Sequence, residues 1–129
     1  MKLAHERTTL TFFAVLSLAS QVPGCGGPVA ADPDRARATL TFALDAWRDG
    51  RTIDEMTSGS PPIVVADPAW KAGFKLSRYQ VADTTRVAGF DLKIPVELWL
   101  QDPKGKAVQE KVKYTVGVHP AQTVIRAPQ

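Results

Sequence analysis

The sequence predicts a small α+β domain in which one amphipathic helix packs on an antiparallel meander of four or five strands. Two observations carry this prediction. Apolar residues recur at helical spacing over residues 36–47, and two long segments, 91–101 and 108–118, alternate apolar and polar residues as half-buried strands do. The apolar stripe of the helix and the apolar face of the sheet must each be buried against another element, so we expect the helix to lie across the sheet.

The helix is expected to begin at Pro33 and to end just before Gly50. Asp32 can cap its first turn, and proline is favoured at the first helical position. Gly50 can adopt the left-handed conformation that terminates helices. The other elements expected are a helical turn over 53–57, a strand over 63–65, a helical turn over 68–72, a strand over 74–81 and a final strand over 122–126.

The turn between the two long strands predicts their register. Asp102-Pro103-Lys104-Gly105 suits a type I turn that ends in a bulged glycine, which makes a three-residue loop. This loop sets apolar residues opposite apolar ones, whereas a two-residue loop would set Leu98 against Gln109. The pairs expected are Leu100 with Val108, Val96 with Val112, Ile94 with Tyr114 and Glu97 with Lys111. Pro95 cannot donate to a ladder, so it should face an open edge or a bulge.

The N-terminus has the pattern of an export signal. Basic residues Lys2 and Arg7 precede the uncharged apolar run of residues 10–19, which is too short to span a bilayer as a stable helix. We therefore interpret residues 1–24 as a signal peptide, residues 25–32 as a flexible tether that begins at Cys25, and residues 33–129 as the folded domain.

Val22-Pro23-Gly24-Cys25 resembles the lipobox of bacterial lipoproteins, from whose usual pattern Pro23 departs. The resemblance implies that Cys25 becomes the lipidated N-terminus. It also implies an exported protein, anchored on the outside of the cytoplasmic membrane or in the outer membrane. Several acyl chains hold a protein firmly where one does not. The alternatives are an ordinary secretory signal cleaved near Ala19 or Ala31, and a retained N-terminal helix.

The predicted element order resembles the cystatin-like and NTF2-like α+β folds in a reduced form, over residues 33–126. The segment 60–81, SPPIVVADPAWKAGFKLSRYQV, is also similar to a segment of small bacterial lipoproteins. Neither resemblance includes a catalytic motif. The order of elements therefore implies a fold, and the NTF2-like group adds the possibility of a pocket between helix and sheet.

Composition excludes several functions. The single cysteine cannot form an intrachain disulfide. The formal net charge of +3 is small and spread over the chain, so it indicates neither nucleic acid nor another polyanion as a partner. After signal cleavage His119 is the only histidine, so no metal cluster and no cofactor are expected. Pro120 follows His119 in a predicted turn, which favours an exposed histidine. Glu110 faces inward near the hairpin tip, where a sheet-end residue is expected rather than a catalytic acid.

Binding is better indicated than catalysis. Trp99 should point outward from the sheet, flanked by Lys111 and Lys113, and an outward tryptophan on a basic strand is typical of a surface that docks a protein or a glycan. Packing against residues 61–70 is the alternative for Trp99, and Trp70 should either anchor its segment on the sheet or stand exposed. The function expected is a non-catalytic binding or scaffold domain on the cell envelope. The alternative is an NTF2-like ligand-binding domain or enzyme.

Overall fold

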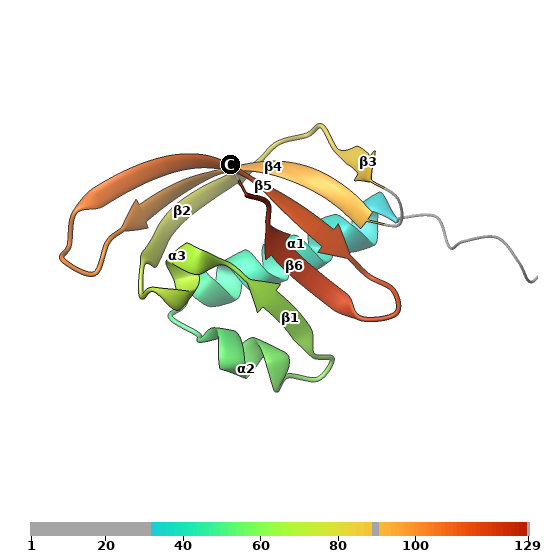
Figure 1. The fold of residues 1–129 in the computed structure, drawn as a ribbon, viewed down its shortest axis with the longest axis horizontal. Helices are drawn as coiled ribbons and strands as arrows, with labels where there is room; N and C mark the ends of the chain where they lie inside the picture. Colours follow the sequence, from blue (N-terminus) through green and yellow to red (C-terminus); the bar gives the residue numbers. More distant parts are fainter. Residues whose placement is uncertain (1–31, 89–90, 129) are drawn as a thin grey trace, which may run out of the picture.

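The computed structural model describes residues 32–88 and 91–128, and these form three helices packed on one curled sheet (Figure 1). The signal peptide, Cys25 and the tether up to residue 31 lie outside the described residues. The elements are α1 (Pro33–Arg48), α2 (Ile53–Thr57), β1 (Ile63–Ala66), α3 (Pro68–Lys71), β2 (Lys75–Val81), β3 (Arg86–Ala88), β4 (Asp91–Gln101), β5 (Ala107–Gly117) and β6 (Gln122–Arg126).

The predicted meander of four or five antiparallel strands is wrong. The sheet is a six-stranded mixed sheet in the order β1-β6-β5-β4-β2, and β3 pairs separately with β4. β1 joins β6 in parallel, with Ile63 opposite Gln122 and Ala66 opposite Ile125. The physical reason is that a short alternating strand shows which face it buries, but not which distant strand it pairs with. The α+β class holds, whereas the simple meander does not.

The helix ends follow the local sequence. The Asp32 carboxylate accepts hydrogen bonds from the backbone N–H groups of Asp34 and Arg35, at 3.1 and 3.2 Å, and Pro33 opens α1. Gly50 follows the helix with a φ of 87°, a left-handed conformation that favours glycine. The predicted helical turns over 53–57 and 68–72 are confirmed as α2 and α3, although α3 ends at Lys71.

The register of the β4–β5 hairpin is confirmed. Leu100 lies opposite Val108, Val96 opposite Val112, Ile94 opposite Tyr114 and Glu97 opposite Lys111. Asp102 holds the loop, because its carboxylate accepts from the N–H groups of Lys104 and Lys106 at 2.9 and 2.8 Å. Gly105 has a φ of 89°, as the bulged turn requires.

Pro95 stands in the middle of β4 without breaking the sheet. Its carbonyl accepts a hydrogen bond from the Ala82 N–H at 2.9 Å, so its nitrogen also faces the side of β2 and β3. β2 has ended there at Val81, and β3 begins only at Arg86. The missing N–H therefore falls at a gap in the neighbouring strands, which is the open edge that a strand proline needs.

One side of the sheet forms the core with α1. Inward residues of β4 and β5 pack against the buried stripe of α1, whose members Leu40, Ala43 and Leu44 are at most 1% exposed. The inward strand residues that are fully or nearly fully buried are Leu92, Ile94, Val96, Leu98, Leu100, Val112, Tyr114 and Val116. The space between α1 and these strands is thus filled by close-packed side chains. The opposite, outer side of the sheet carries the polar residues of the alternation.

Candidate functional site

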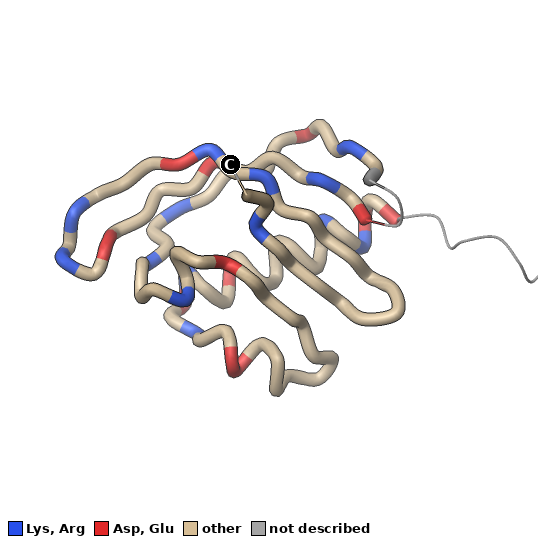
Figure 2. Tube along the Cα trace, viewed as in Figure 1, with Lys and Arg blue, Asp and Glu red and all other residues tan. Residues whose placement is uncertain are grey.

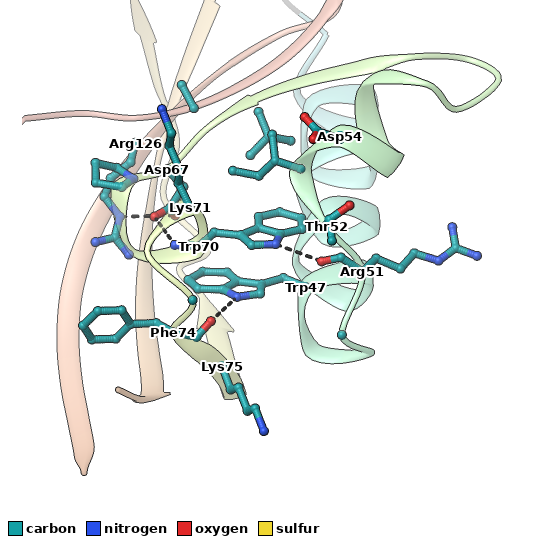
Figure 3. A pocket seen from close by; sticks show the side chains of 16 residues that line it. Trp47, Arg51, Thr52, Asp54, Asp67, Trp70, Lys71, Phe74, Lys75 and Arg126 are labelled. Carbon is teal, nitrogen blue, oxygen red and sulfur yellow. Dashed lines mark hydrogen bonds and ion pairs between the residues drawn. The ribbon is translucent and has the colours of Figure 1, made fainter. Parts of the chain in front are cut away.

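A groove opens beside this core, at the C-terminal end of α1 (Figure 3). Its volume is about 1040 Å³. The walls come from three places: the end of α1 with the start of α2, the segment from β1 through α3, and the start of β2. The lining residues used below are Trp47, Arg51, Asp54, Asp67, Trp70, Lys71, Phe74, Lys75 and Arg126. The groove is larger than a second hollow, of about 450 Å³, on the outer side of the sheet.

Two stacked tryptophans form the apolar wall of the groove. The rings of Trp47 and Trp70 lie 5.2 Å apart, centre to centre, with an angle of 4° between their planes. Trp47 Nε1 donates to the Phe74 carbonyl at 2.8 Å, and Trp70 Nε1 donates to the Arg51 carbonyl at 2.9 Å (Figure 3). Both indole N–H groups are therefore satisfied by the backbone, and the pair fixes α1, α3 and the start of β2 together.

Asp67 is the central polar residue beside this wall, and it is buried. Its Oδ1 caps α3 by accepting from the N–H groups of Ala69 and Trp70, at 3.0 and 3.3 Å. Its Oδ2 accepts from the Tyr114 hydroxyl at 2.5 Å and lies 3.3 Å from Nε of Arg126. One carboxylate thus joins α3, β5 and β6, which lie far apart in the sequence.

Arg126 completes the cluster from the far side. Its Nη1 donates to Glu110 Oε2 at 2.9 Å, and its side chain is 12% exposed. Burial lowers the pKa of Arg126, but the carboxylates of Asp67 and Glu110 and the phenol of Tyr114 outweigh burial and raise the pKa above its usual value. Arg126 therefore stays charged between two carboxylates, as buried ions do when they are paired.

The phenol of Tyr114 cannot serve as a base. Burial first, and then the charge and hydrogen bond of Asp67, raise the pKa of Tyr114 well above its ordinary value. The hydroxyl therefore keeps its proton at physiological pH and donates a hydrogen bond to Asp67. Asp67 contacts both Tyr114 and Arg126, which is the arrangement of a structural network rather than of an activated nucleophile. Nε and Nη2 of Arg126 are nevertheless buried without a hydrogen-bond partner among the described residues.

Charge is unevenly placed around the groove. The lining residues include four basic side chains, Arg51, Lys71, Lys75 and Arg126, and two acidic ones, Asp54 and Asp67. Asp67 and Arg126 pair with each other, so the exposed rim consists of Arg51, Lys71 and Lys75 with the single acid Asp54. An apolar wall with a mostly cationic rim suits an anionic group attached to an apolar body.

The residues that the sequence indicated for a partner surface lie on the other side of the sheet. Lys111 and Lys113 line the second hollow, of about 450 Å³, together with Pro95, Glu97 and the C-terminal Ala127. Trp99 lies on the same side of β4 and is half-buried, with the guanidinium of Arg78 stacked 3.9 Å from its ring centre. The structure therefore brings the two lysines together and places Trp99 under an arginine from β2.

The structure also places the other residues that the sequence analysis discussed, His119, Glu110 and Trp70. His119 is exposed between β5 and β6, as the turn predicted. Glu110 is half-buried at the inner side of β5 and binds Arg126, a partner that the sequence reading missed. Trp70 is buried and does anchor its segment, although it stacks on Trp47 of the helix rather than on the sheet. No group of three His, Cys, Asp or Glu residues within 32–88 and 91–128 could hold a metal ion.

The groove cluster was missed because its members act at long range. Asp67 directly precedes the predicted helical turn over 68–72, where a carboxylate can cap the turn, but only its first oxygen has that role. A usable signal was Arg126, because it lies two residues after the buried Val124 in the same strand and therefore on the same inward side. An arginine at such a position needs a buried acid as its partner.

No family model, no curated protein and no solved structure matches the chain. Among the helices of the described residues, none has the length and apolar character needed to cross a membrane.

Proposed function

We propose that this chain is a lipid-anchored cell-envelope protein whose folded domain binds a partner in the groove beside Trp47 and Trp70 and catalyses no reaction. The observation that supports binding most directly is a groove of about 1040 Å³ whose rim carries Arg51, Lys71 and Lys75. Concave apolar surfaces with a few polar groups are the usual places where proteins bind ligands.

The anchor rests on the sequence Val22-Pro23-Gly24-Cys25 and on the apolar run that precedes it. In this proposal Cys25 carries the acyl chains, and the protein is held on the outside of the cytoplasmic membrane or in the outer membrane. The membrane is then the first partner of the protein, and the occupant of the groove is the second.

A non-catalytic role is favoured by how the polar groups are used. The carboxylate of Asp67 has four neighbours within the fold, and the phenol of Tyr114 is held protonated. The alternative function, a ligand pocket or active site between helix and sheet, has less support. The inward strand residues there are buried apolar side chains, and Tyr114 points to Asp67.

The anchor is tested by replacing Cys25 with serine. We expect the wild-type protein to sediment with membranes and to carry the mass of a lipid-modified cysteine, and the Cys25→Ser variant to lose that modification. A wild-type protein that is soluble and has no lipid mass would contradict the anchor.

Binding in the groove is tested by placing the photo-crosslinking residue benzoylphenylalanine at position 71, on the groove rim, and at position 38 as a control. Ala38 is exposed on α1 and does not line the groove. We expect a defined adduct from position 71 in living cells and none from position 38. Native mass spectrometry of the purified protein gives the second readout: a bound small molecule would favour the ligand-binding alternative, and equal labelling at both positions would refute the groove.

A further inference from the structure

The outer side of the sheet has a strongly basic composition. Residues on this side lie in rows across the strands, and the register places Arg86 opposite Lys93, Lys111 opposite Glu97, and Lys113 opposite Pro95. We define the outer basic face as the basic residues Arg78, Arg86, Lys93, Lys111 and Lys113 with the acidic residues Asp91 and Glu97. Figure 2 shows basic positions along several neighbouring strands of the sheet.

Basic residues outnumber acidic ones on this face. Its five basic and two acidic residues sum to +3. The charge is therefore not evenly spread as the sequence predicted, because these strands gather basic residues on one side of the sheet. All five basic side chains are exposed, whereas Asp91 and Glu97 are half-buried. Glu97 also accepts a hydrogen bond from Gln109.

Trp99 lies within this face. Its ring is half-buried and has the Arg78 guanidinium 3.9 Å from its centre. Tryptophan and arginine side by side suit the boundary between water and lipid headgroups, where an indole inserts its apolar body and a cation meets phosphate. Next to it the hollow of about 450 Å³ places Lys111 and Lys113 beside the apolar rings of Pro95 and Pro128.

The chain length before α1 keeps this face close to a bilayer if the proposed anchor is present. Six residues, 26–31, separate Cys25 from Asp32, and the seven residue steps from Cys25 to Asp32 span at most about 25 Å when extended. In Figure 1 the start of α1 lies at the same end of the molecule as the start of β4, the strand that carries Lys93 and Trp99. The anchor therefore enters the domain at this end of the sheet, from the side on which α1 packs.

We propose that the outer basic face docks on an anionic phospholipid surface and so orients the anchored domain, with the groove directed away from the bilayer. The proposed anchor holds the outer basic face close to the bilayer, but the attraction between this face and anionic lipid does not depend on the anchor. An anionic bilayer fits better than an acidic protein, because the basic residues are spread over four strands and only Lys111 and Lys113 lie at the hollow of about 450 Å³. A broad anionic surface also suits the half-buried ring of Trp99 within this face.

The test uses residues 26–129, which contain all the described helices, strands and core, together with vesicles of phosphatidylcholine alone or with 40% phosphatidylglycerol. We expect partition into the anionic vesicles to be at least tenfold stronger, and to weaken when the salt is raised from 0.1 to 0.5 M. Each basic side chain near an anionic surface contributes about fivefold, so the Lys111→Glu/Lys113→Glu variant should lose about 30-fold or more.

The matched control is Arg51→Glu/Lys71→Glu, which makes the same change of net charge on the groove rim. It should lose less than about threefold, because long-range charge alone is screened at this salt concentration. Both variants should keep the thermal unfolding midpoint of the wild type within a few degrees. Equal losses in the two variants, or equal binding to both kinds of vesicle, would overturn the proposal.

Tryptophan fluorescence locates the contact. Trp47 and Trp70 are 3% and 7% exposed and belong to the groove wall, so Trp99 is the tryptophan able to meet lipid. Brominated phosphatidylcholine in the anionic vesicles should quench the wild-type protein, and Trp99→Phe should abolish the quenching. If Lys111 and Lys113 instead support binding to purified peptidoglycan or to an acidic protein while vesicles bind nothing, the docking proposal is wrong. A soluble, unlipidated wild-type protein that still binds these vesicles would refute the anchor and keep the docking face.

Discussion

The two tyrosines of the chain make nearly the same hydrogen bond in opposite surroundings. The Tyr114 hydroxyl donates to Asp67 at 2.5 Å, and the Tyr79 hydroxyl donates to Asp45 at 2.6 Å. The side chain of Asp67 is 1% exposed, whereas that of Asp45 is 41% exposed. The comparison teaches that neither the length of such a hydrogen bond nor the type of its partners determines how much it contributes to stability. Burial decides what remains unsatisfied when the bond is lost.

The partners of the two carboxylates differ in the same way. Asp67 holds the α3 cap, Tyr114 and the largely buried Arg126 at once. Asp45 accepts from Tyr79 and from Arg48, an exposed residue of its own helix, at 3.0 Å. Water can replace Asp45 for both of its partners, but it has little access to those of Asp67.

Asp67→Asn should have the largest effect. The change leaves the buried charge of Arg126 with Glu110 alone and weakens the bond to Tyr114, and breaking a buried ion pair on one side costs about 3–5 kcal/mol. Asp45→Asn is the matched control and should cost less than about 1 kcal/mol. Urea unfolding of both variants measures the difference. Equal losses would show that burial does not separate the two sites.

Removing the hydroxyls should give a smaller difference in the same direction. Tyr114→Phe deletes a buried hydrogen bond to a charged group and should destabilise the fold by about 1.5–3 kcal/mol. Tyr79→Phe should cost less than about 1 kcal/mol, because water can solvate the exposed Asp45. Thermal unfolding of the two variants is the measurement. A larger loss for Tyr79→Phe would reverse the comparison.

Alkaline pH should reveal the same asymmetry with the smallest effect. Burial, followed by the hydrogen bond to Asp45, raises the pKa of Tyr79 to about 12, and burial with Asp67 raises the pKa of Tyr114 further. A tyrosine in the unfolded chain has a pKa near 10, so above about pH 10 the unfolded chain releases protons that the folded chain retains. Stability therefore falls as pH rises.

For Tyr114 this loss should be about 1 kcal/mol between about pH 10 and pH 11. Urea unfolding at both pH values should show the loss in the wild type and a smaller loss in Tyr114→Phe, which corrects for the lysines that titrate in the same range. Absorbance at 295 nm should show Tyr79 ionising near pH 12, and Tyr114 only when the protein unfolds. An identical pH dependence of wild type and Tyr114→Phe would contradict the role of burial.

Much of the fold could be predicted because it depends on neighbours in the chain. Asp32 and Gly50 bound α1 by interactions that reach only a few residues, and the loop from Asp102 to Gly105 sets the β4–β5 register. The partner of β1 could not be predicted in this way. β1 pairs with β6 across some sixty residues, and its alternating pattern would suit any strand with an open edge.

The candidate site was less predictable than the fold for the same reason. The basic residues Lys111 and Lys113 follow from alternation along β5, which assigned them to the outer face. That Arg78 covers Trp99 depends on a shift of register within β2, between Leu76 and Arg78, and no local pattern marks that shift. The stack of Trp47 on Trp70 joins α1 and α3, which are separated in the chain by α2 and β1.

By itself the sequence determined the helix boundaries, the hairpin register and which residues of β4 and β5 face the core, because these depend on backbone conformation and side-chain alternation over a few residues. Only the tertiary structure decided the parallel pairing of β1 with β6, the groove beside the stacked tryptophans, and the joining of Asp67, Tyr114 and Arg126. Those features depend on which distant surfaces meet when the core closes. The free energy of burying a charge or an indole acts only once they have met.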